Sequence, residues 1–351
     1  MSSFINNLKK RDLFNPYVIA EIGVNHDGSI KKAKLMIDQA KKGGADCVKF
    51  QTYKANLLAS KNSPYYWDIK KENTKSQYLL FKKYDMFDYD DYINLALYCK
   101  KKSIDFLTTP FDNDSVDALD KYLKFYKVAS ADLTNYPLLE KISTKKKTVI
   151  LSVGASTIDE INSAVFFLKK NGIKNIILLH CILNYPTDFK NANLEKIDLL
   201  KRKYKNSIIG YSDHTLPDQN MSSLVLASLK GAKIIEKHFT YNKKLKGNDH
   251  YHAMDYKDLI VYKNILSKFK IINGTANYDP KKLEKKARQN ARRSIVLKKD
   301  LKKNSILKKD DLISKRPGTG ISPSDIHKII GKKINKNLKE DYILQYKDIN
   351  I

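Results

Sequence analysis

Two histidines that each follow a short apolar run carry the clearest chemical signal in this sequence. Residues 208–215 (IIGYSDHT) contain His214, and residues 234–240 (IIEKHFT) contain His238. Runs of β-branched residues that stop abruptly at polar groups are typical of buried parallel strands. Because residues 222–231 (SSLVLASLKG) form a short apolar helical pattern between them, we predict a strand–helix–strand unit with a histidine at each carboxyl end.

Imidazoles at the ends of adjacent strands are a common way to bind a divalent metal that keeps open coordination positions. His214 and His238 are therefore candidate metal ligands. The alternative, from this pair alone, is two unrelated polar strand ends. Residues elsewhere in the chain must decide between a shared metal site and two unrelated strand ends.

Length and composition indicate one large domain and a smaller one. The chain has 351 residues, 42% of them hydrophobic, which is ample for a packed core. No 18-residue run is free of charge and the first residues contain no apolar stretch, so we expect neither a transmembrane helix nor a secretory signal. The three cysteines, Cys47, Cys99 and Cys181, are widely spaced, which argues against a disulfide framework or cysteine zinc site and suits a reducing cytoplasm.

The net charge of +28 raises the question of nucleic-acid binding. Only six of the 66 basic residues are arginine, the residue that supplies bidentate and stacked contacts to nucleic acids. The lysines are spread along the chain among asparagine and isoleucine. We therefore expect a solvated lysine-rich surface and no specific nucleic-acid partner, although a basic field helps to attract anionic substrates.

Short apolar strands alternate with helical patterns from residue 17 onwards, and eight such units over about 270 residues predict a TIM (β/α)8 barrel. No GxGxxG follows the first strand, which weakens the alternative of a dinucleotide-binding fold. The predicted strands are 17–22, 47–51, 105–109, 125–129, 149–152, 176–180, 208–211 and 234–237, with helices at 31–42, 89–102, 115–122, 157–171 and 193–204.

Two regions fall outside this regular pattern. Residues 52–88 form a long, aromatic connection after the second strand, and we expect either a lid beside the site or a self-packed surface loop. After residue 270 the pattern changes to short alternating runs and turns. We predict a barrel over residues 1–275, a basic linker over 276–292 and a small strand-and-turn domain over 293–351.

In a TIM barrel the functional groups gather at the carboxyl ends of the strands. Those ends supply lysines, hydroxyls, carboxylates and histidines, which together favour a phosphate or carboxylate ligand beside a metal. A Schiff base on Lys49 or Lys127 is an alternative. The candidate residues are Glu21, Lys49, Lys127, Ser130, Asp132, Ser152, Asn184, Tyr185, Ser212, His214, Glu236, His238 and Asp249.

Nine motifs in order resemble the sialic acid (N-acetylneuraminate) synthases and the related synthases of legionaminic and pseudaminic acids. They cover essentially the whole chain, including a segment similar to that family's antifreeze-like (SAF, β-clip) domain. The motifs are AEIGVNHDGS (20–29), VKFQTYKA (48–55), YKVASADLTNYPLL (126–139), ILSVGAS (150–156), LLHCILNYPT (178–187), IGYSDHT (209–215), EKHFT (236–240), GNDHYHAMD (247–255) and KRPGTGISP (315–323).

The resemblance implies a transferase that condenses phosphoenolpyruvate with an N-acylated hexosamine such as N-acetylmannosamine. The product would be a nine-carbon 2-keto-3-deoxy acid, with phosphate released by C–O cleavage. It also implies a divalent cation on His214 and His238, with Mn²⁺ expected and Mg²⁺ or Co²⁺ as alternatives. It implies a homodimer in which Arg316 of the antifreeze-like domain reaches the partner's site.

The resemblance also assigns roles within the predicted site. Phosphoenolpyruvate would be met by Lys49, Lys127, Ser130, Ser152 and Ser212. Glu21, Tyr185 and Asp249 would contact the sugar or manage protons. Asp132 is a further candidate catalytic residue, and Asn184 and Glu236 are candidate substrate-binding residues.

Three departures from the family leave the sugar open. Asp132 stands where Glu is common, Leu183 stands where Asn is common with Asn184 one residue later, and the 247–255 loop is unusual. A legionaminic or pseudaminic acid synthase is therefore the alternative enzyme. A catalytically silent module that binds carbohydrate or polyanion is the alternative outside the enzymes.

Four of the five remaining histidines can be interpreted from their position in the sequence. We expect His26 to serve a turn and His180 the core. His250 and His252 either line the site or lie in an exposed loop.

Overall fold

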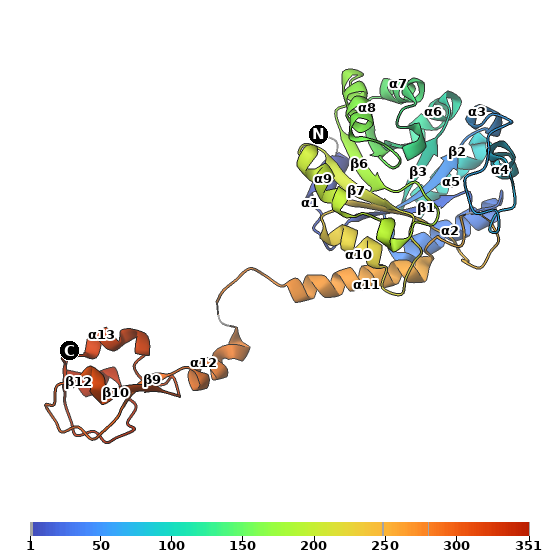
Figure 1. Ribbon diagram of the computed structural model, residues 1–351. Helices are drawn as coiled ribbons and strands as arrows, with labels where there is room; N and C mark the ends of the chain where they lie inside the picture. The colour runs from blue at the N-terminus through green and yellow to red at the C-terminus, as the bar shows by residue number, and fades with distance from the viewer. Residues whose placement is uncertain (1–2, 248, 280, 351) are drawn as a thin grey trace. The chain divides into compact units, whose positions relative to one another are not determined.

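Eight parallel strands form a barrel inside a ring of helices (Figure 1). The computed structural model describes residues 3–247, 249–279 and 281–350, so Asn248 of the 247–255 motif lies outside the described residues. The strands are β1 (Tyr17–Gly23), β2 (Cys47–Thr52), β3 (Asp105–Pro110), β4 (Phe125–Val128), β5 (Thr148–Ser152), β6 (Ile176–Cys181), β7 (Ile208–Asp213) and β8 (Ile234–His238).

The strand order is that of a barrel rather than an open doubly wound sheet. Hydrogen-bonded neighbours run β3-β2-β1-β8-β7-β6-β5-β4, so the first strand pairs with the last. The two ends of this series, β3 and β4, also lie in contact with each other. Nearly every strand residue is buried, because the strands face side chains inside and helices outside. The prediction of a TIM barrel is confirmed.

Two helix ends that sequence signals predicted are confirmed. Thr157 caps α8 and Glu160 returns a hydrogen bond to the Thr157 amide, which completes a capping box. Gly44 ends α2 in the left-handed conformation at φ 90°. The surrounding helices are α2 (Ile30–Gly43), α5 (Tyr89–Lys101), α6 (Asn113–Leu119), α7 (Tyr136–Thr144), α8 (Ile158–Lys170), α9 (Glu195–Lys203), α10 (Ser222–Leu229) and α11 (Tyr256–Asn273).

A short amino-terminal helix, α1 (Ser3–Lys10), covers the amino ends of the strands. Phe4 stacks on Phe125, with ring centroids 4.2 Å apart, and meets the edge of Tyr17. Tyr17 and Phe125 are the first residues of β1 and β4, so this end of the barrel is filled by aromatic packing. We therefore expect the functional side chains at the opposite end of the barrel, where the strands have their carboxyl ends.

The long connection after β2 folds into two helices, α3 (Ala55–Leu58) and α4 (Gln77–Tyr84). Trp67 is buried within it, and its indole N–H donates to the carbonyl oxygens of Glu72 and Thr74. This connection is thus internally packed. Its aromatic residues also line a pocket at the site, as described below.

The second compact unit spans Thr275–Ile351, after a barrel unit of Met1–Gly274. It begins with η4 (Lys282–Glu284) and α12 (Lys285–Ala291). Its core is made of short-strand residues such as Ile295, Leu297 and Ile334. Two small antiparallel sheets pair β9 (Ser294–Leu297) with β10 (Leu312–Lys315) and β11 (Lys333–Ile334) with β12 (Ile349–Asn350). The remaining helical turn is α13 (Ile326–Ile329).

None of the described helices combines the length and the apolar character that a membrane crossing requires.

Candidate active site

Side chains at the carboxyl ends of the strands converge on one face of the sheet. Glu21 is in register with Lys49 of β2 on one side and with His238 of β8 on the other. Ser212 and Glu236 are in register on β7 and β8. Because residues in register on adjacent strands point to the same side, and residues two apart do likewise, these five side chains share the barrel interior.

Lys49 is held as a buried cation between two carboxylates. Its side chain is almost fully enclosed, and Nζ lies 2.6 Å from Glu21 Oε2 and 3.8 Å from Glu236 Oε1. Nζ also donates to Thr109 Oγ1 at 3.0 Å. Burial acts to lower the pKa of Lys49, but the negative charges of Glu21 and Glu236 outweigh it and raise that pKa. Lys49 therefore stays charged and offers no free amine for a Schiff base.

Lys127 lies on the far side of Glu236. Its Nζ donates to Ser152 Oγ at 2.7 Å and lies 3.7 Å from Glu236 Oε1. Ser212 Oγ donates to the same carboxylate oxygen at 3.0 Å. Burial lowers the pKa of Lys127, with Glu236 opposing the shift. The two lysines and two serine hydroxyls thus form a compact group of donors suited to an anion.

The two buried glutamates have pKa values that move in opposite directions. Burial raises the pKa of Glu21; Lys49 opposes this rise, and the nearby Glu236 charge adds to it. Burial also acts to raise the pKa of Glu236, but Lys127 and Lys49 together bring it below its ordinary value. When their environments push the pKa values of two carboxyl groups apart, the group with the higher pKa can act as an acid and the other remains a carboxylate. Glu21 is therefore the group able to carry a proton, whereas Glu236 remains an anion.

His214 and His238 lie together against Tyr185. Their ring centroids are 5.5 Å apart, and the Tyr185 ring lies 4.1 Å from that of His214. His214 Nδ1 is hydrogen-bonded to the Ile182 carbonyl oxygen at 2.7 Å, so its other ring nitrogen is available to a ligand. Burial, reinforced by His238, lowers the pKa of His214 to about 3. The imidazole is then neutral, which is the form that binds metals.

Asp249 supports His238 from the loop after β8. Asp249 Oδ2 lies 3.2 Å from His238 Nδ1. Burial acts to raise the pKa of Asp249, but His238 outweighs it and holds that pKa well below the ordinary value. His238 Nδ1 is buried without a hydrogen-bond partner among the described residues. Imidazoles beside an anionic carboxylate, with a ring nitrogen left over, are a suitable donor set for a divalent cation.

Four predicted residues have other surroundings. Ser130 Oγ accepts from the Gly154 amide at 2.9 Å, and Asp132 accepts from Asn135 at 3.0 Å. Asn184 is exposed and donates to the Pro186 carbonyl oxygen. Arg316 follows β10 in the second unit, where it is exposed. Contacts of these four residues with a substrate stay predictions.

The aromatic connection of residues 52–88 forms one side of the site. A small pocket next to His238 and Asp249 is lined on its other side by residues of that connection. These are Tyr53, Tyr66, Trp67, Leu80, Phe81 and Tyr84, with Val24, Gln51 and Tyr185 completing the lining. The connection is therefore a wall of the site as well as a self-packed loop.

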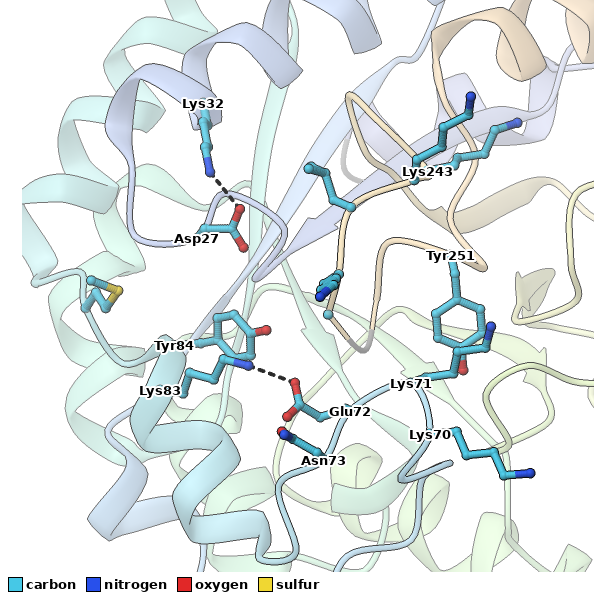
Figure 2. Close-up of a pocket in the computed structure, with 15 residues that line it drawn as sticks. Asp27, Lys32, Lys70, Lys71, Glu72, Asn73, Lys83, Tyr84, Lys243 and Tyr251 are labelled. Carbon is cyan, nitrogen blue, oxygen red and sulfur yellow. Dashed lines mark hydrogen bonds and ion pairs between the residues drawn. The ribbon is translucent and has the colours of Figure 1, made fainter.

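A larger, basic pocket of about 1030 Å³ shares Tyr84 with the smaller one (Figure 2). Three of its lysines are paired: Lys32 with Asp27 at 2.8 Å, Lys83 with Glu72 at 2.9 Å and Lys243 with Asp258 at 2.7 Å. Lys70, Lys71, Lys244 and Lys246 also line it. The lysines make this approach to the site positive, which favours the arrival of an anion.

Sequence reasoning overlooked two polar residues of the barrel interior. Gln51 donates to Glu21 Oε1 at 3.1 Å, and Thr109 accepts from Lys49. Both could have been found from the two-residue period of a strand, because Gln51 follows Lys49 by two positions.

An ion pair on the outer face of the barrel was also overlooked. Lys237 Nζ lies 2.5 Å from Asp213 Oδ2, and both side chains are buried. Each residue directly precedes a candidate metal histidine, so this pair fixes the strand ends that carry His214 and His238.

The other histidines follow the predictions in part. His26 Nδ1 accepts from the Gly28 amide within a turn, and His180 Nε2 is hydrogen-bonded to Ala192 in the core. His250 and His252 are both buried, so neither belongs to an exposed loop.

A TIM barrel with buried lysines, hydroxyls and imidazoles at its carboxyl end is the arrangement expected of an enzyme that binds an anionic substrate. The profile of the NeuB family matches residues 36–277, and that of the SAF domain matches residues 292–350. The chain belongs to the NeuB family and contains a SAF domain. The prediction of a phosphoenolpyruvate-condensing enzyme is confirmed at the level of that family.

Individual relatives cover most of the chain. The N,N'-diacetyllegionaminic acid synthase of Campylobacter jejuni is 39% identical, over 93% of this chain and 98% of the relative. The N-acetylneuraminate-9-phosphate synthase of Drosophila melanogaster is 31% identical, over 93% of each. The crystal structure of an N-acetylneuraminic acid synthetase from Leptospira borgpetersenii with citrate has a TM-score of 0.67 and 34% identity, covering 78% of this chain and 90% of that one.

Proposed function

We propose that this protein is an N-acetylneuraminate-type synthase, which condenses phosphoenolpyruvate with an N-acylated hexosamine such as N-acetylmannosamine. A bond forms between C3 of phosphoenolpyruvate and the sugar's aldehyde carbon. Water adds its oxygen at C2, and phosphate leaves by C–O cleavage to give a nine-carbon 2-keto-3-deoxy acid. The observation that carries the proposal is the grouping of Lys49, Lys127, Ser152 and Ser212 within one barrel interior that also holds His238.

Each residue has a physical role in this proposal. Lys127 and Lys49, with the serine hydroxyls, bind the phosphate and carboxylate of phosphoenolpyruvate. Glu21 has the raised pKa that suits proton transfer at the reacting carbons, whereas Asp249 stays anionic beside His238.

Metal binding is part of the same proposal. His214 and His238 hold the cation, with Mn²⁺ expected and Mg²⁺ or Co²⁺ as alternatives. When bound, such an ion polarises the sugar's aldehyde and positions water.

A legionaminic acid synthase is a second candidate of nearly equal standing. It is favoured by the 39% identity to the Campylobacter jejuni enzyme, which exceeds the 31% to the Drosophila melanogaster enzyme. Asp132, Leu183 and Asn184, where the sequence departs from the sialic acid synthases, are consistent with a differently decorated sugar. Pseudaminic acid synthesis is a third variant of the same chemistry.

The proposal extends to assembly and location. A homodimer would bring Arg316 of one subunit's SAF domain to the sugar's acyl group in the partner's site. A cytoplasmic location is supported by three cysteines that are all free and buried.

The decisive experiment is a substrate panel. Purified protein with Mn²⁺ and phosphoenolpyruvate is incubated with N-acetylmannosamine, its 6-phosphate and di-N-acylated 6-deoxyhexosamines, and both phosphate release and 2-keto acid are measured. The best sugar identifies the product class. The Lys127→Met variant is the matched control and should release no phosphate. Absence of phosphate release with every sugar would overturn the proposal in favour of a catalytically silent binding module.

A further inference from the structure

His252 is a fully buried imidazole to which no described residue gives a hydrogen bond. Its side chain is 0% exposed, and among the described residues neither ring nitrogen has a hydrogen-bond partner. Buried histidines with a hydrogen-bonded ring nitrogen contrast with it, as in His180, bonded to the Ala192 carbonyl oxygen, and His250, bonded to Thr240 Oγ1 at 2.8 Å. A buried polar group left unpaired costs free energy, so its retention indicates a ligand.

The surroundings of His252 show what that ligand would be. Asp249 Oδ1 lies 3.7 Å from His252 Nε2, while Asp249 Oδ2 lies 3.2 Å from His238 Nδ1. The His238 and His252 rings are 4.9 Å apart and nearly perpendicular, at 73°. One nitrogen of each histidine and one Asp249 oxygen lie within 4.8 Å of one another. Two imidazoles and one carboxylate at such spacing can converge on a single cation.

The backbone holds the loop that carries His252 in place. Met254 donates its amide to the His238 carbonyl oxygen at 2.8 Å, and the Thr240 amide donates to the Met254 carbonyl oxygen at 2.9 Å. The Asn25 side chain donates to the Asp249 carbonyl oxygen at 3.3 Å. The loop thus runs alongside the end of β8. These backbone hydrogen bonds hold His252 beside His238 without the help of a bound ion. Preorganised donors of this kind are typical of metal sites.

We propose that His238, Asp249 and His252 form a three-ligand site for a divalent cation, in which Asp249 and His252 are direct ligands. The proposal rests on the proposed function for what the ion does: it keeps His238 of the pair that the family resemblance implies and adds Asp249 and His252 to it. His214 lies outside this group of three. The donor set suits Mn²⁺, Co²⁺ or Zn²⁺ and keeps positions open for substrate oxygens.

Cobalt binding to the full-length protein tests the site without turnover. Chelator-treated wild type, His252→Gln and His250→Gln are each titrated with Co²⁺ by calorimetry. His252→Gln should weaken binding by about 100-fold or more, beyond the loss expected for a residue that only supports a ligand. His250→Gln, on the same loop but with its ring already hydrogen-bonded, should stay within about threefold of wild type.

A second variant gives a positive signal that does not depend on lost stability. In His252→Cys, a thiolate that binds Co²⁺ produces a thiolate-to-cobalt charge-transfer band in the near ultraviolet. His250→Cys and the wild type, which retains Cys181 near His214, should lack this band. Wild-type affinity in His252→Gln, or a His252→Cys protein that binds Co²⁺ without the band, would overturn the proposal. Either result leaves phosphate release, and hence the proposed function, untouched.

Discussion

Lys49 Nζ and Glu21 Oε2 lie 2.6 Å apart inside the barrel, on adjacent strands. The lysine that the anionic substrate is expected to meet therefore already has a counter-ion. Removing one member of such a pair would leave a buried charge uncompensated, which is costly. Glu21 thus has two separable roles: it keeps Lys49 charged, and its raised pKa makes it a proton carrier.

Replacing Glu21 by glutamine should separate these roles. Gln keeps the size and one hydrogen bond of Glu21 but transfers no proton, so kcat should fall by about 10²- to 10⁴-fold. The KM for phosphoenolpyruvate should change less, because Lys49 retains Glu236 at 3.8 Å. Steady-state phosphate release measures both constants, with Glu195→Gln, an exposed glutamate of α9, as the control. An unchanged kcat would show that Glu21 moves no proton.

Binding of phosphoenolpyruvate should weaken as pH rises. Only the protonated form of Lys127 attracts the anion, and burial lowers its pKa below that of an ordinary lysine. The proton is therefore lost at a lower pH than for a surface lysine, and KM should rise in the alkaline range. Lys127→Arg should flatten this rise, because a guanidinium does not titrate there. The same rise in KM for wild type and Lys127→Arg would rule Lys127 out as its cause.

The buried pair of Asp213 and Lys237 should dominate the stability of the β7 and β8 strand ends. Asp213 also accepts hydrogen bonds from Tyr211 and Thr215, so Asp213→Ala leaves Lys237 buried and unpaired. The free energy of unfolding should fall by about 3–5 kcal/mol, measured by denaturant titration with circular dichroism. Asp117→Ala, which breaks exposed pairs with two lysines, should cost less than about 1 kcal/mol. Equal losses in both variants would refute this ranking.

The proposed exchange of SAF domains can be tested by complementation. Arg316→Ala removes the residue predicted to act in the partner's site, and Lys127→Met disables the barrel. If the domain acts across the dimer, co-expression of the two variants should restore phosphate release that neither shows alone. Sedimentation should then report a dimer. A monomer, or a mixture no more active than its components, would contradict the exchange. Arg316 would then act in the site of its own subunit or in no site.

The barrel could be predicted from the sequence because its signals are local. Apolar β-branched runs, helix caps and glycine stops each act over a few residues, and all eight strands lie within two residues of their predicted ends. The interior positions of Glu21, Lys49 and Glu236 also follow from the two-residue strand period.

The surroundings of His252 could not be predicted in this way. Its burial depends on a loop that lies against the end of β8 through long-range backbone hydrogen bonds.

The sequence by itself determined the barrel, the family and most of the residues that could do chemistry, because the strand period and the order of the motifs can be read along the chain. Only the tertiary structure decided the partners: Glu21 with Lys49, Asp213 with Lys237, and Asp249 between His238 and His252. The physical reason is that Coulomb attraction and desolvation depend on distance and burial. Distance and burial are set by strand register and loop packing, which no local pattern encodes.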